Sequence, residues 1–313
     1  MVLYHVSAQK LPVIVILGPT AVGKTALSID LCLEYNGEVV NQDSRQVYRY
    51  MDIGTAKPTR EQQAKVHHHC IDLVNPDETW TLAQQQELSY RTIDSLLDRH
   101  KVPFVVGGTG QYLKAIIEGW NIPRVAPNPE IRDSLRAIAK QKGTKFLHDK
   151  LRSVDPVAAE RILPGDLRRI IRALEVFELT GRPISELQSS EPPKYDFLIL
   201  GLTMDRPKLY ERIENRTKDM LRRGLLEEIQ GLLDMGYGWD LPSMQSIGYG
   251  DFQPYFEGRS SLEECLRHLS YHNHKLVRHQ YVWFRKFRDV NWFDPTTDTD
   301  LVHMKSLINR HLS

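Results

Sequence analysis

An apolar run that leads into a phosphate-binding motif constrains this chain more than any other feature of its sequence. Residues 11–17 are apolar, which predicts a strand. The pattern G-x-x-x-x-G-K-[ST] follows at once, as Gly18, Pro19, Thr20, Ala21, Val22, Gly23, Lys24 and Thr25. A helix is predicted from Lys24 to about Tyr35, so the motif stands between a strand and a helix, as its mechanism requires. Backbone N–H groups at such a helix N-terminus bind an anion, Lys24 adds a positive charge, and the Thr25 hydroxyl can ligate Mg²⁺. The motif therefore predicts a site for a di- or triphosphate.

Strand and helix patterns alternate through the first 125 residues. Residues 38–40 and 102–106 predict two further strands, and residues 83–99 predict a helix with one apolar stripe. Strands that alternate with helices predict an α/β fold in which helices cover both faces of a parallel sheet.

The composition and the periodicity of the sequence change after Trp120. Residues 121–129 contain three prolines, and the charged helical patterns that follow give way to an apolar strand at residues 197–202. Further helices are predicted within residues 208–233 and 261–287. We therefore predict two parts: a P-loop α/β core with C-terminal helices, residues 1–125 plus 196–313, and a mostly helical insertion, residues 126–195.

Composition narrows the class of protein. The chain has 41 Lys+Arg against 40 Asp+Glu. This balance excludes a uniformly basic surface that binds nucleic acid, but it is compatible with a local basic patch. Three cysteines without a C-x-x-C pair exclude a disulfide framework and a cysteine-rich zinc site, and they suit a reducing compartment. The apolar stretches are too short to span a bilayer, and the first twelve residues lack the basic start and apolar core of a secretion signal. We expect a cytoplasmic protein with no membrane contact.

Asp43 is the candidate acid–base residue. Neither residues 102–106 nor residues 197–202 end in the acid that an ATPase usually places after an apolar strand. Asp43 follows the predicted strand at residues 38–40, so it would project at the carboxyl edge of the sheet, where ligands of open α/β folds bind. The alternative is that Asp43 only caps a helix or forms an Asx turn.

Several further blocks resemble the tRNA dimethylallyltransferase (tRNA isopentenyltransferase) family, in its bacterial form without a zinc finger. They lie in family order along the chain, as Asp43-Ser-Arg-Gln-Val-Tyr48, Met51-Asp-Ile-Gly-Thr-Ala-Lys-Pro58, Val106-Gly-Gly-Thr-Gly-Gln-Tyr-Leu113, Arg168-Arg-Ile-Ile-Arg-Ala-Leu-Glu-Val176, Gln245-Ser-Ile-Gly-Tyr249 and, more loosely, Gln280-Tyr-Val-Trp-Phe-Arg285. Together these blocks are more specific than the phosphate-binding motif alone.

The resemblance implies a transfer reaction. Members of this family move a dimethylallyl group from dimethylallyl diphosphate to N6 of the adenosine on the 3′ side of the anticodon, and Mg²⁺ assists. Asp43 matches the base that takes a proton from N6, and Thr109 matches a hydroxyl placed near the reacting nitrogen and the diphosphate. Arg216 resembles an arginine that binds the diphosphate together with the eight motif residues. The alternatives are a helix N-cap for Thr109 and an ordinary solvated charge for Arg216.

The resemblance also implies contacts with the anticodon stem-loop of tRNA. The matching residues are Asp43, Ser44, Arg45, Gln46, Arg168, Arg169, Arg172, Gln245, Ser246, Ile247, Gly248, Tyr249, Gly250, Arg278 and Gln280. Arg168 and Arg172 are four residues apart and share a helix face suited to phosphates. Independently of the resemblance, residues 265–288 combine six Lys/Arg and five aromatic residues without an acid, a composition that suits RNA. His274, His279 and Gly250 depart from the family pattern. We expect the protein to be a monomer.

Two other functions compete with the transferase. A small-molecule or nucleoside kinase would use ATP as donor and could use the helical insertion as an arginine-bearing lid, and an RNA-binding NTPase switch would share the phosphate-binding motif. Neither predicts the blocks at residues 43–58 and 107–109. The run His67-His68-His69-Cys70 does not predict a zinc site, because consecutive strand residues point to alternate faces.

Overall fold

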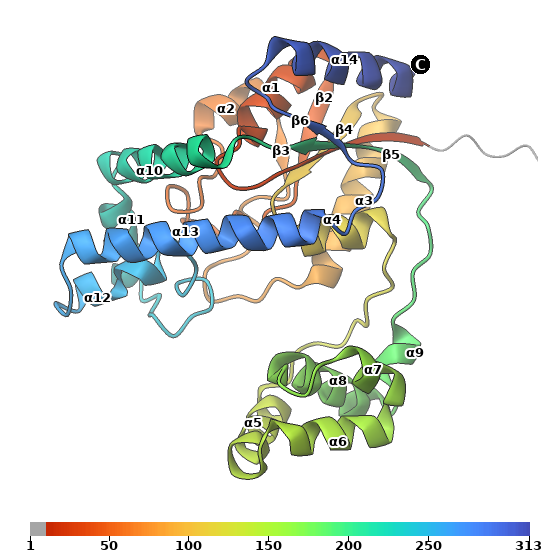
Figure 1. The fold of residues 1–313 in the computed structure, drawn as a ribbon, viewed down its shortest axis with the longest axis vertical. Helices are drawn as coiled ribbons and strands as arrows, with labels where there is room; N and C mark the ends of the chain where they lie inside the picture. Colours follow the sequence, from red (N-terminus) through yellow and green to blue (C-terminus); the bar gives the residue numbers. More distant parts are fainter. Residues whose placement is uncertain (1–10) are drawn as a thin grey trace, which may run out of the picture. The chain divides into compact units, whose positions relative to one another are not determined.

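A six-stranded, all-parallel sheet forms the centre of the α/β part of the chain (Figure 1). The computed structural model describes residues 11–313, so most of the stretch in which no secretion signal was expected lies outside the described residues. In the order β3-β2-β4-β1-β5-β6, the strands are β3 (His68–His69), β2 (Gly37–Asn41), β4 (Val102–Gly107), β1 (Leu11–Leu17), β5 (Tyr195–Leu202) and β6 (Asn291–Phe293). The sheet confirms the predicted α/β fold class.

Strand β1 shows why this sheet needs helices on both faces. Val13, Val15 and Leu17 belong to one buried cluster, and Ile14 and Ile16 belong to another. A strand that is apolar on both sides is stable only when both faces are covered. Helices with buried residues in the Ile14/Ile16 cluster are α1 (Lys24–Glu34), α10 (Arg206–Arg222), α14 (Asp298–Leu312) and, through Val277, the middle of α13 (Leu262–Phe284). Those in the other cluster are α3 (Leu82–Asp98), α4 (Gly110–Ile117) and the carboxyl end of α13.

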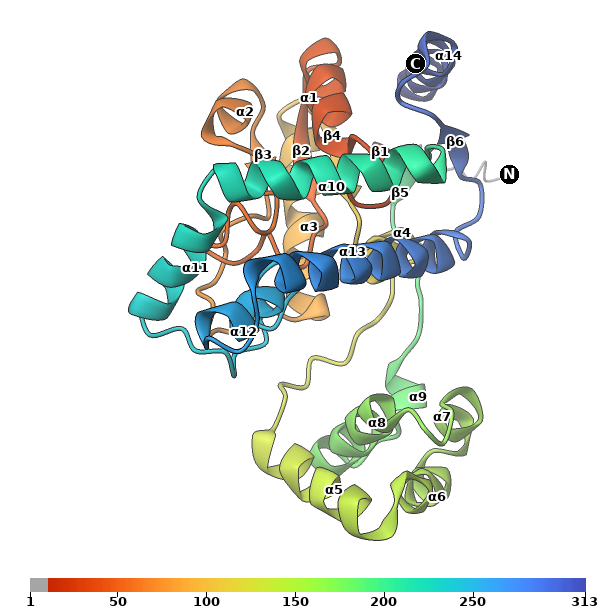
Figure 2. The same ribbon diagram turned by 60° about the vertical axis from the view of Figure 1, so that its left-hand side comes forward.

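Helices α10 and α13 run alongside one another, as Figures 1 and 2 both show. The amino-terminal half of α13 packs in a third apolar cluster with α11 (Leu225–Asp234) and with Tyr249 and Phe252. The helical stretch predicted within residues 208–233 is divided into α10 and α11 at Gly224, which adopts a left-handed conformation with φ 94°. The remaining short helices of this part are α2 (Arg60–Lys65), η1 (Gly250–Phe252) and α12 (Gln253–Phe256).

The helical insertion is a compact unit with its own core. It spans Glu118–Pro193, and the other unit comprises the chain up to Ile117 together with Lys194–Ser313. The predicted boundary at residue 126 is therefore late. The Glu191 N–H donates to the Gly119 carbonyl at 2.9 Å, which joins the two ends of the insertion before its first helix begins. Its helices are α5 (Pro129–Lys142), α6 (Thr144–Val154), α7 (Pro156–Arg161), α8 (Leu167–Thr180) and α9 (Ile184–Leu187).

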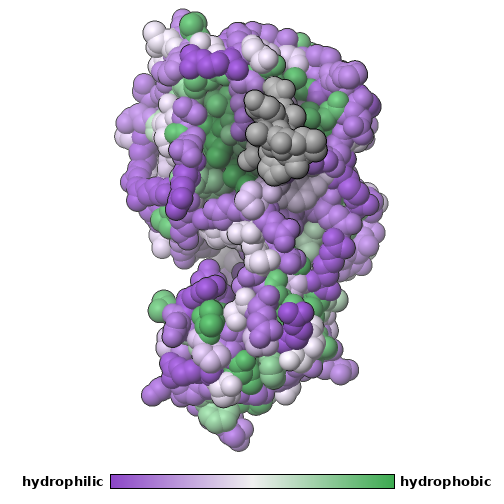
Figure 3. All heavy atoms as spheres, turned by 90° about the vertical axis from the view of Figure 1, so that its right-hand side faces the viewer, coloured by the Kyte–Doolittle hydropathy of each residue, from purple (hydrophilic) through white to green (hydrophobic). Residues whose placement is uncertain are grey.

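The surface is mostly hydrophilic. Seen from the side, a hollow in one part of the surface exposes hydrophobic residues between hydrophilic ones (Figure 3). Within residues 11–313, none of the helices combines the length and the apolar character that crossing a membrane requires.

Candidate active site

Four adjacent parallel strands end at the same edge of the sheet and place the predicted site residues there. Leu17 of β1 is in register with Gly107 of β4 and with Gly201 of β5, and Asn41 of β2 is in register with Val106 of β4. The loops that follow these four strands are therefore neighbours. Ligands of open α/β sheets bind at this edge, which agrees with the expectation for Asp43 and Thr109.

The phosphate-binding loop has the backbone geometry that its glycines permit. Gly23, which precedes α1, has φ 113°, a conformation that side chains rarely adopt. The Lys24 ammonium donates to the carbonyls of Gly18 and Pro19 at 2.9 and 2.8 Å, so the lysine folds over the loop. Burial lowers the pKa of Lys24 to about 8, with Asp43 opposing the shift and Arg216 adding to it. The loop thus holds a cation with no ion pair among the described residues.

Arg216 reaches the loop from α10. Its guanidinium Nη2 donates to the Thr20 hydroxyl at 2.8 Å, and its Nε is buried without a partner among the described residues. Burial lowers the pKa of Arg216 to about 10, although Asp43 raises it. The interpretation of Arg216 as an ordinary solvated charge is therefore wrong. A buried guanidinium with an unused N–H beside a phosphate loop is suited to binding an anion.

Asp43 and Thr109 lie beside this cationic cluster. One Asp43 oxygen, Oδ1, accepts the Arg45 N–H at 2.8 Å, so the Asx turn considered from the sequence does form. The other oxygen has no hydrogen bond to a described residue. Thr109 does not cap α4 with its side chain; its hydroxyl oxygen accepts the Ser44 N–H at 3.1 Å. This bond joins the loops after β2 and β4 and brings the Asp43 segment next to Thr109.

Gln280 connects the phosphate-binding loop to the loop after β4. Its Oε1 accepts the Thr20 N–H at 2.9 Å, and its Nε2 donates to the Gly108 carbonyl at 3.1 Å. A Cβ atom at Gly108 would lie 2.6 Å from Gln280 Nε2, so a larger residue there would displace the Gln280 amide. The sequence comparison suggested an RNA contact for Gln280, but its buried amide has two protein partners. A contact of Gln280 with tRNA stays a prediction.

Several other residues matched to tRNA contacts are buried in the protein. Gln46, Ser246, Gly248 and Tyr249 are all buried. The Tyr249 hydroxyl donates to Glu228 Oε1 at 2.6 Å, and the Gln46 amide donates to backbone carbonyls of the loop at residues 55–56. Outside the helical insertion, the exposed members of the set are Arg45, Gln245, Ile247 and Arg278, and the partly exposed ones are Asp43, Ser44 and Gly250.

Glu228 on α11 organises this region. Its carboxylate accepts the N–H groups of Asp52, Ile53 and Gly54 at 3.0, 2.8 and 3.1 Å, in addition to the Tyr249 hydroxyl. A Cβ atom at Gly54 would lie 2.5 Å from the Tyr249 ring. The blocks around residues 52–54 and 245–249, far apart in the sequence, therefore form one structure.

The three arginines on α8 differ in their surroundings. Arg172 donates to the fully buried Glu175 at 2.7 Å and to the Val125 carbonyl at 2.9 Å, so much of its guanidinium is occupied within the insertion. Arg168 and Arg169 are exposed, and Arg169 is 3.3 Å from Asp166. The face predicted to be shared by Arg168 and Arg172 thus carries one arginine without an ion pair to a described residue and one that is already paired.

The structure adds a residue to the site that no sequence signal singled out. Arg212 lies one turn before Arg216 on α10, and its Nη2 is 3.6 Å from the position of a Cβ at Gly23.

His274, which departs from the family pattern, stacks on Tyr210 at 3.8 Å between ring centroids and lies 3.5 Å from Glu214. It therefore joins α13 to α10.

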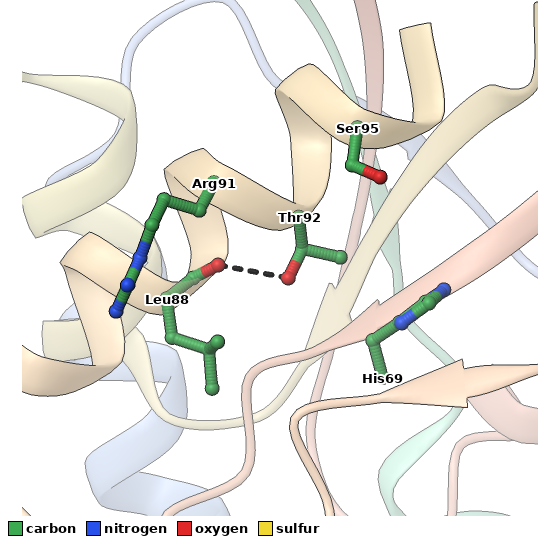
Figure 4. Close-up of a pocket in the computed structure, with 5 residues that line it drawn as sticks. All are labelled: His69, Leu88, Arg91, Thr92 and Ser95. Carbon is green, nitrogen blue, oxygen red and sulfur yellow. Dashed lines mark hydrogen bonds between the residues drawn. The ribbon is translucent and has the colours of Figure 1, made fainter. Parts of the chain in front are cut away.

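Two further observations concern possible metal ligands and a cavity away from the phosphate-binding loop. In the described part of the chain no three His, Cys, Asp or Glu residues gather as a metal site. A cavity of about 340 Å³ lies between α3 and the end of β3, lined by His69, Leu88, Arg91, Thr92 and Ser95 (Figure 4). It shares no residue with the loop, Asp43 or Thr109.

Comparison with known proteins gives consistent results. The family model described as IPP transferase matches residues 46–287, and the model described as isopentenyl transferase matches residues 11–75. The tRNA dimethylallyltransferase of Roseiflexus castenholzii is 52% identical over 280 residues, which cover 90% of this chain and 92% of the relative. That of Herpetosiphon aurantiacus is 50% identical over 274 residues, which cover 88% and 87%.

Solved structures agree with the sequence relatives. The tRNA isopentenylpyrophosphate transferase of Bacillus halodurans is 40% identical, with a TM-score of 0.71 and 97% of both chains covered. A eukaryotic dimethylallyltransferase acting on tRNA is 28% identical, with a TM-score of 0.80, covering 96% of this chain and 79% of its own. These relatives favour the transferase over the kinase and the NTPase switch. The chain belongs to the tRNA dimethylallyltransferase family.

Proposed function

We propose that this protein transfers the dimethylallyl group of dimethylallyl diphosphate to N6 of the adenosine that follows the anticodon of a tRNA, and releases diphosphate. The single observation that carries the proposal is that Asp43 lies beside Lys24 and Arg216 at one edge of the sheet. One oxygen of this carboxylate makes no hydrogen bond to a described residue. A kinase would also use Lys24, but it would not need an acceptor for the protons of a nucleobase amine at this position.

Different residues act on the leaving diphosphate and on the attacking N6 nitrogen. Lys24, Arg216 and the loop N–H groups stabilise the negative charge that develops on the departing diphosphate. The N6 nitrogen of adenine is a poor nucleophile because its lone pair is delocalised into the ring. Asp43 Oδ2 accepts a proton from N6 as the new C–N bond forms and the C–O bond to the diphosphate breaks. The Thr109 hydroxyl accepts the Ser44 N–H, and its proposed role is to contact the reacting nitrogen and the diphosphate.

The residues at the loop fit a magnesium ion, which we propose as the cofactor. The Thr25 hydroxyl has no hydrogen bond to a described residue and belongs to the first turn of α1. Mg²⁺ prefers one or two protein oxygens together with phosphate oxygens and water, rather than a cage of protein ligands. When bound, the ion would supply positive charge to the leaving diphosphate. Thr25 is the residue that would hold it.

The partner we propose is the anticodon stem-loop, in which the target base must leave its stack to reach Asp43. Arg45, Gln245 and Arg278 are the exposed residues that support this contact. One chain supplies the loop, Asp43, Thr109, Arg216 and Gln280, which supports a monomer as the active form. Since tRNA is the substrate, we place the reaction in the cytoplasm.

Transfer of label from dimethylallyl diphosphate to unmodified tRNA tests this function. We expect wild-type protein with Mg²⁺ to label the tRNA, and Asp43→Asn to lose transfer by about 10²- to 10⁴-fold, as expected for loss of a general base. Asp43→Asn retains the Asx turn through its side-chain oxygen, so the loop keeps its shape. Full transfer by Asp43→Asn would remove the base assignment, and ATP consumption without labelled tRNA would favour the kinase.

A further inference from the structure

A second, smaller hollow lies beside the phosphate-binding loop, at the carboxyl end of β5. Its volume is about 200 Å³, and the residues that line it are Thr203, Met204, Arg206, Tyr281 and Arg285. Three of these follow β5 or begin α10; Tyr281 belongs to the last turn of α13, and Arg285 directly follows that helix. We call this hollow the Arg206/Arg285 pocket. It shares no residue with the site described above.

The pocket and the phosphate-binding loop have common walls. The Leu202 carbonyl, next in the chain to Thr203, lies 2.8 Å from the position of a Cβ at Gly18. On the other side, Gln280 precedes Tyr281 and accepts the Thr20 N–H of the loop at 2.9 Å. β5 and α13 thus each contact the loop within one residue of the pocket.

Arg212 also lies between the two sites. Its Nη1 is 4.0 Å from the sulfur of Met204, which lines the pocket, and its Nη2 is 3.6 Å from the position of a Cβ at Gly23, which belongs to the loop. The Arg212 guanidinium therefore lies close both to a residue of the loop and to a residue that lines the pocket.

The lining of the pocket suits an anion. Neither Arg206 nor Arg285 makes an ion pair or a side-chain hydrogen bond with another described residue, and no carboxylate lines the pocket. The Thr203 and Tyr281 hydroxyl oxygens are 3.0 Å apart. Only one hydrogen lies between these two oxygens, so the second hydroxyl hydrogen is free to donate to a ligand. The volume corresponds to about six or seven water molecules, which leaves room for one small polyanion.

We propose that the Arg206/Arg285 pocket is a second anion site, which holds inorganic diphosphate after it leaves the phosphate-binding loop. The proposal rests on the proposed function only for the source of the diphosphate. At the loop, Lys24 and Arg216 bind the product with buried charge, which favours a tight complex and slow release. A neighbouring site with two exposed guanidinium groups lowers the barrier between the loop and solvent, and by the same field it attracts the diphosphate end of the incoming donor.

Binding of inorganic diphosphate by protein that lacks Lys24 tests the second site directly. In Lys24→Ala we expect weak binding of one equivalent to remain, measured by calorimetry without tRNA. Adding Arg206→Gln and Arg285→Gln should weaken this remaining binding at least tenfold. The matched control adds Arg222→Gln and Arg223→Gln, which remove the same charge from the other end of α10, and it should bind like Lys24→Ala. Equal affinity of the two triple variants would overturn the proposal.

Association kinetics give a second test in protein that retains Lys24. At about 0.01 M salt we expect Arg206→Gln/Arg285→Gln to bind diphosphate about fivefold more slowly than Arg222→Gln/Arg223→Gln, and near 1 M salt we expect the difference to vanish. Equal rates at low salt would contradict the proposal. Protein that shows both effects but labels no tRNA would refute the proposed function and leave the second site in place.

Discussion

At the residue scale, Lys24 is the group that we expect to make diphosphate binding depend on pH. Burial, the largest effect, lowers the pKa of Lys24, and the balance with Asp43 and Arg216 leaves it at about 8. The charged form binds diphosphate, and at pH 9 only about a tenth of the free protein carries it. Because about half of the free protein is charged at pH 8, we expect the affinity for inorganic diphosphate to fall about fivefold from pH 8 to pH 9, measured by titration calorimetry. Lys24→Arg keeps its charge and should lack this decline, so the same decline in both proteins would show that diphosphate, not Lys24, titrates.

Gln280 can be assigned to the donor end or to the RNA end of the reaction by substitution. Gln280→Leu leaves the Thr20 N–H and the Gly108 carbonyl without partners, at a cost of about 1–3 kcal/mol for each buried group. We expect the KM for dimethylallyl diphosphate to rise about tenfold and the KM for tRNA to change less. Arg278→Gln, two residues away and exposed, should show the opposite pattern in steady-state kinetics. A rise in the tRNA KM alone for Gln280→Leu would favour a direct RNA contact.

Residues of the site were predictable from sequence where their chemistry is local. The spacing of Gly18, Gly23 and Lys24 determines a loop geometry by itself, and the position of Asp43 after a strand determines the edge at which it lies. Gln280 and Tyr249 are different, because their partners are distant in the chain. No pattern around Tyr249 reveals that its hydroxyl binds Glu228.

At the scale of elements, α11 holds two loops in place through one carboxylate. Glu228 accepts three backbone N–H groups at residues 52–54 as well as the Tyr249 hydroxyl. Glu228→Gln leaves one acceptor oxygen for these four donors, and each hydrogen bond to a charged group is worth about 1.5–3 kcal/mol. We expect the free energy of unfolding in urea to fall by at least that amount. Glu227→Gln, at the exposed neighbouring position, should change it little, and equal effects of both variants would contradict this role.

Strand and helix prediction worked for elements with enough residues to show a period. β1 runs from Leu11 to Leu17, as its apolar run indicates, and α3 differs from the prediction by one residue at each end. β3 and β6 have only two and three residues, too few to show alternation, and they form because the neighbouring strands β2 and β5 offer free edges. Such short strands depend on the sheet rather than on their own sequence.

At the scale of the whole molecule, the chain has two units with separate cores. In the unit Glu118–Pro193, the fully buried Glu175 accepts from Arg132 and Arg172. Burial raises the pKa of Glu175, but these hydrogen bonds outweigh it and the net pKa is lowered. This contribution to stability is present above the ordinary glutamate pKa and is lost as pH falls through the lowered value.

Loss of Glu175 should therefore act on one unit. Glu175→Ala leaves two arginines without their partner, and removing one member of a buried ion pair costs about 3–5 kcal/mol. We expect faster amide hydrogen exchange in α5 and α8 and unchanged exchange in β1 and α1. Equal acceleration in both units would show that the two cores unfold together.

The bridge formed by Gln280 also has a consequence for biosynthesis. The phosphate-binding loop is complete once residue 25 has been translated, but the side chain that holds the Thr20 N–H is added only at residue 280. At about 5–20 residues per second, a ribosome needs roughly 13–50 s to cover that interval. A nascent chain interrupted before this point carries the loop without its clamp, and we expect it to bind diphosphate more weakly than the finished protein does.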